Sequence, residues 1–568
     1  MSMLMQRPIR WLLVVGVGLA VAGTPTAPAA TARGRHRSPS KLSDKARDEG
    51  KNRGTSNLDV IVRFKKEPGT AERSLLQAFG GTVRRQHRSR WMTVRVPGRQ
   101  VEKLANDPAI EFVTVDAPLS VAAMDVSRAT AGLPASIQTE SALKGAGVTI
   151  AVIDSGVARR PELPGLVASV DMVGTYDPAF APTGSVDPNG HGTHVAGILV
   201  GDGTHSLGGK YAGIAPEASL VSIRVLDGAG RGNTSAMMAG LQWVLDHKNE
   251  YGIRVLNLSL GHPVYESAET DPLVQMVEDV WDSGIVVVCS AGNSGRDGHG
   301  TVTSPCNSRK VITVGALNDR QTAGTLDDAV TTYSSRGPTL VDLVAKPDIL
   351  APGNKIVSLR SAGSTLDLEL PTSRVAGDLT RPWDVDYFEL SGTSMAAPMV
   401  AGAATLMLEQ EPALNPGTVK ARLMLSARKG AVGDPFATGA GALDILAALR
   451  TTGEVADAPS PLVLVDSATN ALSFENTGVL WSNTTFSLPA LWSDAVVWSA
   501  GTSWDAAQLS SSGVLLPDTT ANALLWPEAM LWPEATLWPD STLWSEAVLW
   551  PDAAGIAIQT LSTRVEDP

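Results

Sequence analysis

Short apolar runs rich in β-branched residues alternate with helix-like segments over residues 148–449 of this 568-residue chain. Such runs are typical of strands that are buried on both faces of a parallel sheet. The pattern therefore predicts an α/β domain, a mostly parallel sheet flanked by helices, with enough residues to bury a sizeable core. The expected strands are 148–154, 219–226, 253–260, 284–292 and 310–317, and the clearest helices are 233–248 and 271–284.

A smaller alternating pattern precedes this domain, over residues 58–116. Its order of strand, helix, two strands, helix and strand predicts a small α+β domain of the ferredoxin-like, split βαβ type. The expected elements are 58–64, 71–80, 82–87, 90–96, 100–107 and 110–116. Residues 33–57 are basic and lack periodicity, so they are predicted to be a flexible linker.

The first 32 residues have the parts of a secretory signal peptide. Arg7 and Arg10 precede an apolar run over 11–23, and small-residue cleavage sites follow. That run is shorter than the roughly 20 residues that cross a bilayer, and no later segment is long and apolar enough. We therefore expect a secreted protein without a stable membrane span.

Charge is unevenly distributed along the chain. Residues 1–120 hold 21 Lys and Arg against 10 Asp and Glu, whereas the remainder holds 25 against 48. This asymmetry suggests two parts of one precursor that attract each other. A basic nucleic-acid-binding arm is the alternative, but the basic residues are interleaved with a regular apolar pattern, so no nucleic-acid partner is expected.

The C-terminal extension, 451–568, has one basic residue against 14 acidic ones and nine of the 14 tryptophans. Five of these recur every sixth position: Trp526, Trp532, Trp538, Trp544 and Trp550. A period of six places the indoles on one side of an extended strand or a polyproline II helix. Binding to a glycan or a cell surface and a weakly ordered structural tail both fit this pattern, so the partner of the tail stays unknown.

Three polar residues follow or precede apolar runs in a suggestive order. Asp154 ends a predicted strand, His191 opens an apolar helical stretch, and Ser394 precedes a long apolar helix. Functional residues of α/β sheets gather beyond the carboxyl ends of the strands, and backbone N–H groups at a helix start stabilise negative charge. Asp, His and Ser in this order form one of the known catalytic triads.

Four segments carry a family resemblance: VIDSGV (152–157), HGTHVAGI (191–198), SAGN (290–293) and SGTSMAAP (391–398). They resemble the catalytic and oxyanion segments of the subtilisin-like serine proteases, the subtilases or peptidase S8 family. The stretches 256–267, 331–340 and 346–359 look most like the AprX-like branch.

The resemblance implies a secreted serine endopeptidase that cuts proteins and peptides through an acyl-enzyme. Ser394 would be the nucleophile, His191 its general base, and Asp154 the group that orients the imidazole. Asn293 would donate its side-chain amide to the oxyanion. The chemistry needs no cofactor and no metal ligand is assigned, while structural calcium, common in the family, has no residues assigned to it.

The same resemblance implies where substrate and propeptide bind. Gly230 and Gly232 on one side, and Ser259 and Gly261 on the other, would pair with an extended substrate. Ala291 and Gly292 would wall an apolar, permissive pocket, with Cys306 near its floor. Residues 58–124 would be an inhibitory propeptide that binds the peptidase domain, 125–450, in cis and is self-cleaved between about Val115 and Val126.

Several alternatives stay open from the residues alone. His191 and His194 are spaced to share a metal ion, but no HExxH motif or Cys cluster supplies further ligands, so His194 is expected to be a packed or hydrogen-bonded residue. Cys289 and Cys306 fit either one disulfide or two buried thiols. A pseudo-enzyme used for adhesion and an esterase are the other functions considered, although the esterase elbow motif is lacking because Ala396 replaces its last glycine.

Overall fold

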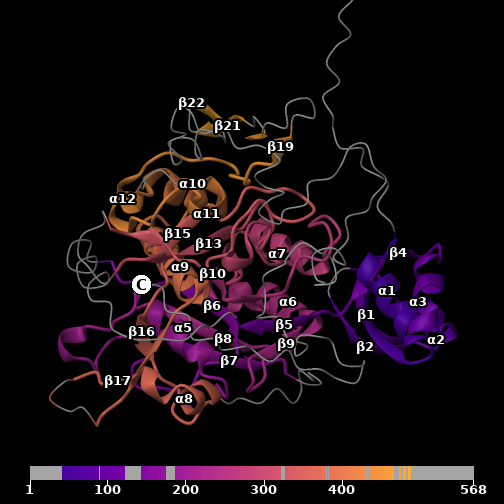
Figure 1. Cartoon of the computed structure of the whole chain (residues 1–568), viewed down its shortest axis with the longest axis horizontal. Helices are drawn as coiled ribbons and strands as arrows, with labels where there is room; N and C mark the ends of the chain where they lie inside the picture. The colour runs from indigo at the N-terminus through magenta and orange to yellow at the C-terminus, as the bar shows by residue number, and fades with distance from the viewer. Residues whose placement is uncertain are drawn as a thin grey trace, which may run out of the picture. The chain divides into compact units, whose positions relative to one another are not determined.

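The structure is a computed structural model (Figure 1). It describes residues 41–87, 90–121, 143–173, 186–320, 327–378, 380, 383–428 and 434–465, with three short strands, β20 (Leu472–Phe474), β21 (Gly478–Trp481) and β22 (Thr484–Ser487). The predicted signal peptide and the tryptophan repeats lie outside the described residues. Among the helices that the structure does describe, none is both long and apolar enough to cross a membrane.

The main sheet has eight strands, and every pairing in it is parallel except that of β14. Its order is β14-β13-β12-β10-β6-β8-β7, and β15 also pairs with β13. The strands are β6 (Thr149–Asp154), β7 (Leu166–Asp171), β8 (Ser219–Arg224), β10 (Ile253–Leu258), β12 (Val286–Ser290), β13 (Ile312–Asn318), β14 (Ala329–Val330) and β15 (Ile349–Pro352). The predicted mostly parallel α/β sheet is confirmed.

Helices cover both faces of this sheet (Figure 1). On one face α5 (His191–Val200) packs against α9 (Thr393–Gln410), and on the other α6 (Thr234–Tyr251) packs against α7 (Pro272–Asp282). Residues Thr393 to Leu408 of α9 are all buried, as expected for a helix that is apolar all round. The remaining helices of this domain are α8 (Thr365–Glu369), α10 (Pro416–Ser426), α11 (Pro435–Thr438), α12 (Ile445–Arg450), and the 3-10 turns η2 (Leu207–Gly209), η3 (Gly295–Asp297) and η4 (Pro371–Ser373).

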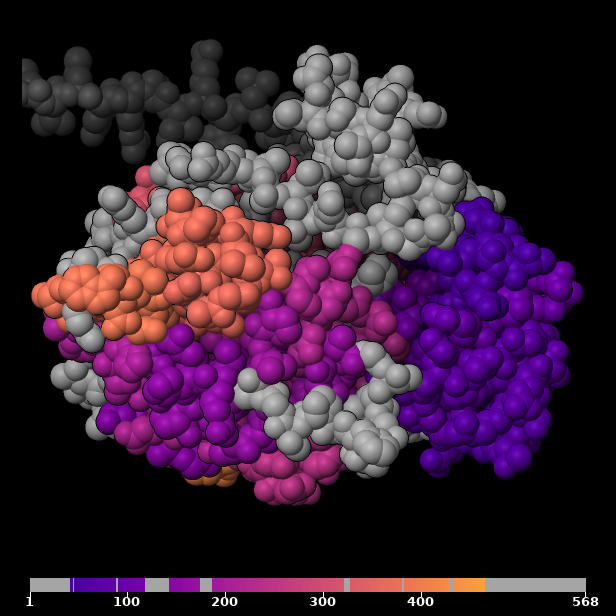
Figure 2. Space-filling model, turned by 90° about the horizontal axis from the view of Figure 1, so that it is seen from below, coloured from indigo at the N-terminus to yellow at the C-terminus, as the bar shows by residue number. Residues whose placement is uncertain are grey.

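A small antiparallel sheet, β16 (Ile356–Leu359), β18 (Tyr387–Leu390) and β17 (Arg374–Val375), flanks α5. The chain between β16 and β18 carries α8. In the space-filling view the segment from β16 to β18 is orange, and it lies directly against the purple surface of the part of the chain around α5 (Figure 2).

The N-terminal domain consists of β1 (Asn57–Phe64), α2 (Thr70–Ala78), β2 (Thr82–Gln86), β3 (Trp91–Pro97), α3 (Gly98–Ala105) and β4 (Ile110–Val115). Its sheet order, β2-β3-β1-β4 with antiparallel pairs, is that of a split βαβ domain. Val60, Val62 and Phe64 of β1 point into its own core. Ile61 and Trp91 instead belong to the core of the larger α/β domain. Both faces of this small sheet are therefore used.

The prediction of a flexible linker over 33–57 is wrong for its second half. Asp44–Arg53 forms helix α1, capped by Ser43, whose hydroxyl accepts the Ala46 N–H. Leu42 and Ala46 are buried, and α1 packs on α3 where Gly50 meets Gly98 so closely that a Cβ on Gly98 would lie 2.6 Å from the Gly50 carbonyl oxygen. The buried non-polar residues of this segment, Leu42, Ala46 and Gly50, are too few to form a periodic apolar pattern, and the sequence therefore did not predict the helix.

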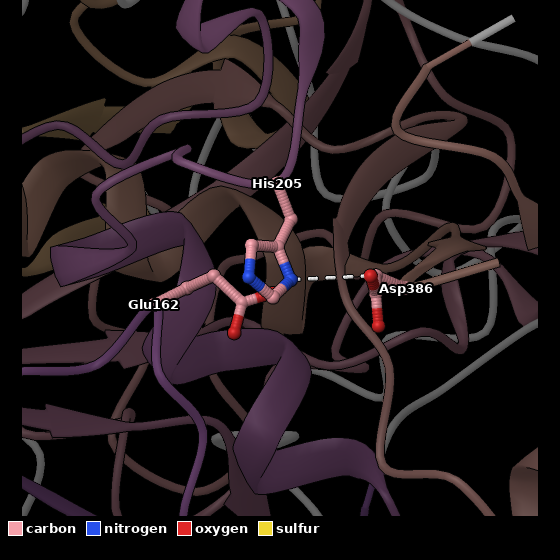
Figure 3. A group of neighbouring side chains, drawn as sticks. All are labelled: Glu162, His205 and Asp386. Atoms are coloured by element: carbon pink, nitrogen blue, oxygen red, sulfur yellow. Dashed lines mark hydrogen bonds and ion pairs between the residues drawn. The ribbon is translucent and has the colours of Figure 1, made fainter. Parts of the chain in front are cut away.

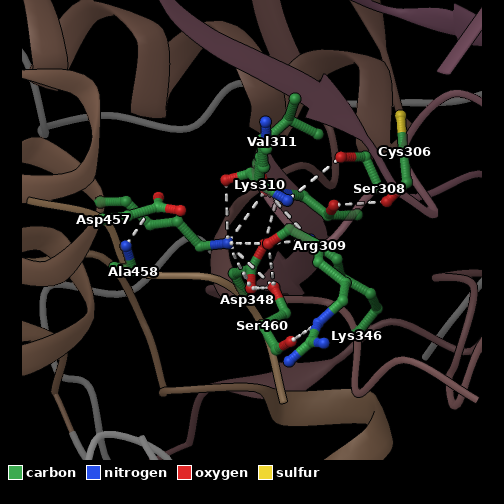
Figure 4. Close-up of polar contacts among 12 residues, drawn as sticks. Cys306, Ser308, Arg309, Lys310, Val311, Lys346, Asp348, Asp457, Ala458 and Ser460 are labelled. Atoms are coloured by element: carbon green, nitrogen blue, oxygen red, sulfur yellow. Dashed lines mark hydrogen bonds and ion pairs between the residues drawn. The ribbon is translucent and has the colours of Figure 1, made fainter. Parts of the chain in front are cut away.

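The chain does not leave the larger α/β domain at residue 450, where the sequence suggested that the extension begins. Val344 bridges to Leu462, and the Val463 N–H donates to the Leu343 carbonyl. The strand β19 (Val463–Val465) follows. Ser460 reaches a fully buried cluster formed by Lys346, Asp348 and Lys420 (Figure 4). Residues up to about 465 thus belong to the folded body.

Candidate active site

Asp154 and His191 meet where the end of β6 faces the start of α5. The His191 Nδ1–H donates to Asp154 Oδ1 at 2.8 Å, and both side chains are buried. A Cβ on Gly192 would lie 2.0 Å from the Gly156 carbonyl oxygen, so only glycine allows the two segments to approach so closely. The structure thus brings together two of the residues selected from the sequence.

Ser394 is the second residue of α9, the helix that packs against α5. Its Oγ donates to the Ser259 carbonyl oxygen at 3.1 Å, and the Ser259 hydroxyl donates to the Ser394 carbonyl at 3.0 Å. His191 Nε2 and Asp154 Oδ2 are buried and have no hydrogen-bond partner among the described residues. A buried ring nitrogen without a partner is costly, and a catalytic role is one explanation for its persistence.

Asn293 follows β12 and lies beside the start of α9. Its side-chain oxygen accepts both the Thr393 N–H, at 3.0 Å, and the Thr393 hydroxyl, at 2.9 Å. These two donors fix which end of the amide is oxygen, so that its NH₂ group is the end suited to donate to a substrate oxygen. Because Thr393 is the residue before Ser394, these two bonds hold Asn293 next to the turn of α9 that carries Ser394.

Two chain edges flank a third strand near these residues. β9 (Arg231–Asn233) and β11 (Leu260–Gly261) each pair antiparallel with β5 (Pro118–Val121), the last described segment of the N-terminal domain. Gly232 pairs with Leu119, and Gly261 pairs with Ser120. Gly230 has φ 69° in the turn before β9, and Ser259 precedes β11. An extended peptide is therefore seated between the edges selected from the sequence.

Comparisons with known proteins agree with this arrangement. Residues 145–441 match the model of the subtilase family of peptidases, which is about half of the chain. The chain belongs to the subtilase family. It is a serine-type endopeptidase, a hydrolase, as this membership and its relatives indicate.

This subtilase is 42% identical to serine protease AprX of Bacillus subtilis (strain 168) over 313 residues, 54% of this chain and 67% of AprX. It is 33% identical to subtilisin DY of Bacillus licheniformis over 309 residues, 54% of this chain and 92% of that protein. The crystal structure of fervidolysin from Fervidobacterium pennivorans, a keratinolytic enzyme related to subtilisin, aligns with a TM-score of 0.55 at 22% identity, over 70% of this chain and 61% of that one. This last likeness supports the fold.

Ala291 and Gly292 of the subtilase, predicted to wall the substrate pocket, come directly after β12. Thr303 was not selected from the sequence, yet it lies between Gly292 and Gly261. A Cβ on Gly292 would be 3.0 Å from Thr303 Cγ2, and one on Gly261 would be 2.9 Å from Thr303 Oγ1. The only signal in the sequence was its place next to Ser304 and Pro305, in a loop whose position depends on the tertiary fold.

His194 is a packed residue of α5 rather than a partner of His191. Its Nε2 lies 2.9 Å from the Phe388 carbonyl oxygen and 3.1 Å from that of Ile356, so this nitrogen carries the proton. Burial, with the neighbouring His191 as a second cause, lowers the pKa of His194 to about 3. The expectation from the sequence is confirmed.

The two cysteines are free thiols. Cys289 and Cys306 are fully buried and close together, and Cys306 follows the loop that carries Thr303. Burial, together with the adjacent Cys289, raises the pKa of the Cys306 thiol well above its usual value. Of the two alternatives left open by the sequence, the structure has buried thiols.

One group of possible metal ligands occurs in the described residues: Glu162, His205 and Asp386 (Figure 3). Arg160 Nη2 donates to Glu162 Oε1 and to Asp386 Oδ1, each at 2.8 Å, and His205 Nδ1 lies 3.1 Å from Asp386 Oδ2. Calcium needs six to eight oxygen ligands, whereas here a guanidinium already pairs both carboxylates and the third group offers nitrogen. This cluster does not fit calcium.

Proposed function

We propose that this subtilase cuts peptide bonds through Asp154, His191 and Ser394, and that it is made as a secreted zymogen. His191 Nε2 takes the Ser394 proton as Oγ attacks the carbonyl carbon, and it returns that proton to the leaving amine. Asp154 holds Nδ1–H and stabilises the imidazolium. A water molecule then releases the acyl group by the same route. The observation that carries this proposal is the 2.8 Å bond from His191 Nδ1 to Asp154, with Nε2 left unpartnered.

The transition-state oxyanion would be held by the Asn293 amide and the Ser394 N–H. Both belong to the start of α9 or contact it, where backbone N–H groups favour negative charge. Donors that are fixed in advance stabilise the developing charge without reorganising.

The substrates would be proteins and peptides bound in extended form. β5 supports this because it pairs through its backbone with β9 and β11. Main-chain pairing recognises any extended peptide, and selectivity then depends on the pocket near Ala291, Gly292 and Thr303.

The N-terminal domain would act as the propeptide in cis. Several contacts support this. Thr114 Oγ1 donates to Glu266 Oε1 at 2.6 Å, Arg85 donates to the Ser235 carbonyl at 2.9 Å, and Asp116 accepts the Ser235 N–H at 2.7 Å at the start of α6. Ile61 and Trp91 in the shared core would anchor the domain while β5 occupies the proposed substrate site.

The register of β5 indicates which bond is cut. Ser120 pairs with Gly261 and Val121 with Leu260, so the described part of β5 ends one residue short of Ser259 in this register. The Ser259 carbonyl contacts Ser394 Oγ. The bond between Ala122 and Ala123 would therefore be the one attacked, within the predicted range of 115–126.

A Ser394→Ala variant of the full chain tests this proposal. We expect it to be purified as an uncut precursor, whereas the unaltered chain gives a mature protein whose N-terminal sequencing starts at Ala123. Normal processing of the variant would rule out self-cleavage. A mature start elsewhere, with the variant still uncut, would correct only the register argument.

Export and the tail form separate parts of the proposal. Secretion is supported by the signal-like residues 1–32, and a glycan or cell-surface partner for the tail by the row of tryptophans over 526–550. Culture medium of cells that make the full chain should contain the mature protein. Deleting 467–568 should abolish its retention on cell-wall glycans, and unchanged retention would exclude that partner.

A further inference from the structure

Asp187 is a buried carboxylate, 6% exposed, on the segment that leads into α5. Both of its oxygens are saturated with hydrogen bonds. Oδ1 accepts the Gly190 N–H and the Ser155 hydroxyl, each at 2.8 Å. Oδ2 accepts the Thr193 N–H at 2.8 Å and the Thr193 hydroxyl at 2.7 Å.

These donors come from the two segments that carry Asp154 and His191. Ser155 directly follows Asp154, and its N–H donates to Asp154 Oδ1 at 2.7 Å. Gly190 and Thr193 flank His191. The Ser155 hydroxyl also accepts the Gly192 N–H at 3.0 Å, so one carboxylate and one hydroxyl join the end of β6 to the first turn of α5.

Asp187 is itself held from the opposite side. Its backbone carbonyl accepts the Ser361 hydroxyl at 3.0 Å. The carbonyls of the next two residues, Pro188 and Asn189, accept the N–H groups of Thr365 and Leu366 at 2.9 and 3.0 Å. These two residues begin α8, which therefore fixes the segment from which Asp187 reaches the site.

We propose that Asp187 is a positioning residue for peptide-bond hydrolysis: through Ser155 and the start of α5 it sets the geometry of the Asp154–His191 pair. This inference rests on the catalytic roles proposed above. A displacement of about 1 Å in a catalytic group can cost about 100-fold in rate. Within the described part of the chain, the side chain of Asp187 bonds to Ser155, Gly190 and Thr193 and not to β9 or β11, which pair with the extended peptide, so substrate binding should not depend on it.

The test compares Asp187→Asn, Ser155→Ala and the double variant as mature enzymes purified from the full chain. Active sites are titrated with a serine-directed phosphonate, and kcat and KM are measured on a peptide substrate. Asparagine presents an NH₂ group to one pair of these donors. We expect kcat to fall about 10- to 100-fold for Asp187→Asn with KM changed less than about threefold.

The two substitutions should not be additive, because they break the same connection. The double variant should lose no more kcat than Asp187→Asn alone. Ser155→Ala also keeps the inference testable if Asp187→Asn does not fold, since a fall in kcat at unchanged KM is expected for it as well.

Asp444→Ala is the matched control, because the Asp444 carboxylate accepts the Ala447 N–H at the start of α12, away from the segments that carry Asp154 and His191 in the sequence. It should lower the melting temperature and leave kcat unchanged. The inference is overturned if Asp187→Asn lowers only the melting temperature, if KM rather than kcat changes, or if the two effects add. If His191→Ala stays active, the proposed triad is wrong. If His191→Ala is inactive but Asp187→Asn keeps its full kcat, only the inference about Asp187 is wrong.

Discussion

Two buried polar clusters of this subtilase differ in how completely their atoms are hydrogen-bonded. In the cluster of Lys346, Asp348, Lys420 and Ser460 (Figure 4), Asp348 Oδ2 accepts Lys346 Nζ at 2.7 Å and the Thr313 N–H at 2.8 Å. Asp348 Oδ1 accepts the Ser460 hydroxyl at 2.5 Å. At the active site, His191 Nε2 and Asp154 Oδ2 have no partner among the described residues.

The difference separates stability from chemistry. Lys420 Nζ donates to the carbonyl oxygens of Arg309, Lys310 and Val311 at 3.0 to 3.2 Å, and the side chains of Lys346, Asp348 and Lys420 are fully buried. Burial lowers the pKa of Lys420 to about 7. A saturated cluster of this kind offers no atom to a substrate, whereas a site that must exchange a proton keeps an acceptor unpaired at the cost of stability.

The largest effect should come from removing the unpaired acceptor. In His191→Ala, kcat should fall on the order of 10⁶-fold, the size measured when a subtilisin loses this kind of group, because Ser394 then has no base. The melting temperature should fall as well, because the change also removes the Nδ1–H bond to Asp154 and leaves a cavity where a fully buried imidazole was. Peptide hydrolysis and calorimetry measure the two. Retained activity would mean that unpaired atoms do not mark the catalytic site.

Breaking the saturated cluster should have the opposite outcome. Asp348→Asn leaves two buried ammonium groups with one fewer charge partner, so the free energy of unfolding should fall by about 3–5 kcal/mol. Urea denaturation of the mature enzyme measures this change, and kcat per titrated active site should stay the same. Loss of kcat at unchanged stability would contradict the distinction.

Asn293 tests whether a proposed hydrogen-bond donor to the oxyanion, like the proposed base His191, contributes to the reaction rate rather than to stability. Asn293→Ala should lower kcat about 100- to 1,000-fold with little change in KM, because the amide acts on charge that is present only in the transition state. Steady-state kinetics on one peptide substrate measures both constants. An effect confined to KM would assign Asn293 to substrate binding instead.

Ser460 gives a smaller change on the stability side. Ser460→Ala removes one of the hydroxyl contacts of Asp348 and Lys420, and it should cost about 1–3 kcal/mol of unfolding free energy. Urea denaturation, compared with Ser473→Ala in the described strand β20, measures it. Equal stability of the two variants would show that the segment up to 465 adds nothing to the folded body.

Asp116 differs from both buried clusters. Its carboxylate accepts hydrogen bonds from Ser235, but this contact would become exposed to solvent when the proposed propeptide dissociates. Burial raises the pKa of Asp116 to about 6, and burial also raises that of Glu266, beside Asp271, well above its usual value. A raised carboxyl pKa favours the bound state fully below pH about 4, and this contribution is lost as pH rises through about 6.

The affinity of the separated propeptide for the mature enzyme should therefore fall roughly tenfold between pH 5 and pH 8. Inhibition constants measured across this range test it. Asp116→Asn should weaken the dependence, and an affinity that rises with pH would contradict the assignment.

Local patterns were sufficient for much of the fold. The strands β6, β8, β10, β12 and β13 were each anticipated by a β-branched run, because burial on both faces leaves a continuous apolar signal. The positions of Asp154, His191 and Ser394 at the ends of elements followed from the same patterns. Family motifs supplied their roles, which periodicity does not contain.

Contacts between distant segments left no such signal. Among the described side-chain positions of α1, only Ala46 and Gly50 are buried. Ile61 and Trp91 have the same apolar character whether they face their own helices or the larger domain. Thr303 comes next to Gly292 and Gly261 through a loop, and Asp187 bonds to the segments that follow β6 and begin α5 only after these two elements have met.

By itself the sequence determined the alternation of strands and helices, the residues that can do the chemistry, and the split βαβ order of the N-terminal domain. Only the tertiary structure decided that β5 lies between β9 and β11, that residues up to 465 complete the body, and that Asp187 joins β6 to α5. The reason is physical: periodicity records which side of an element is buried, while the partner that buries it is set by packing between residues far apart in the chain.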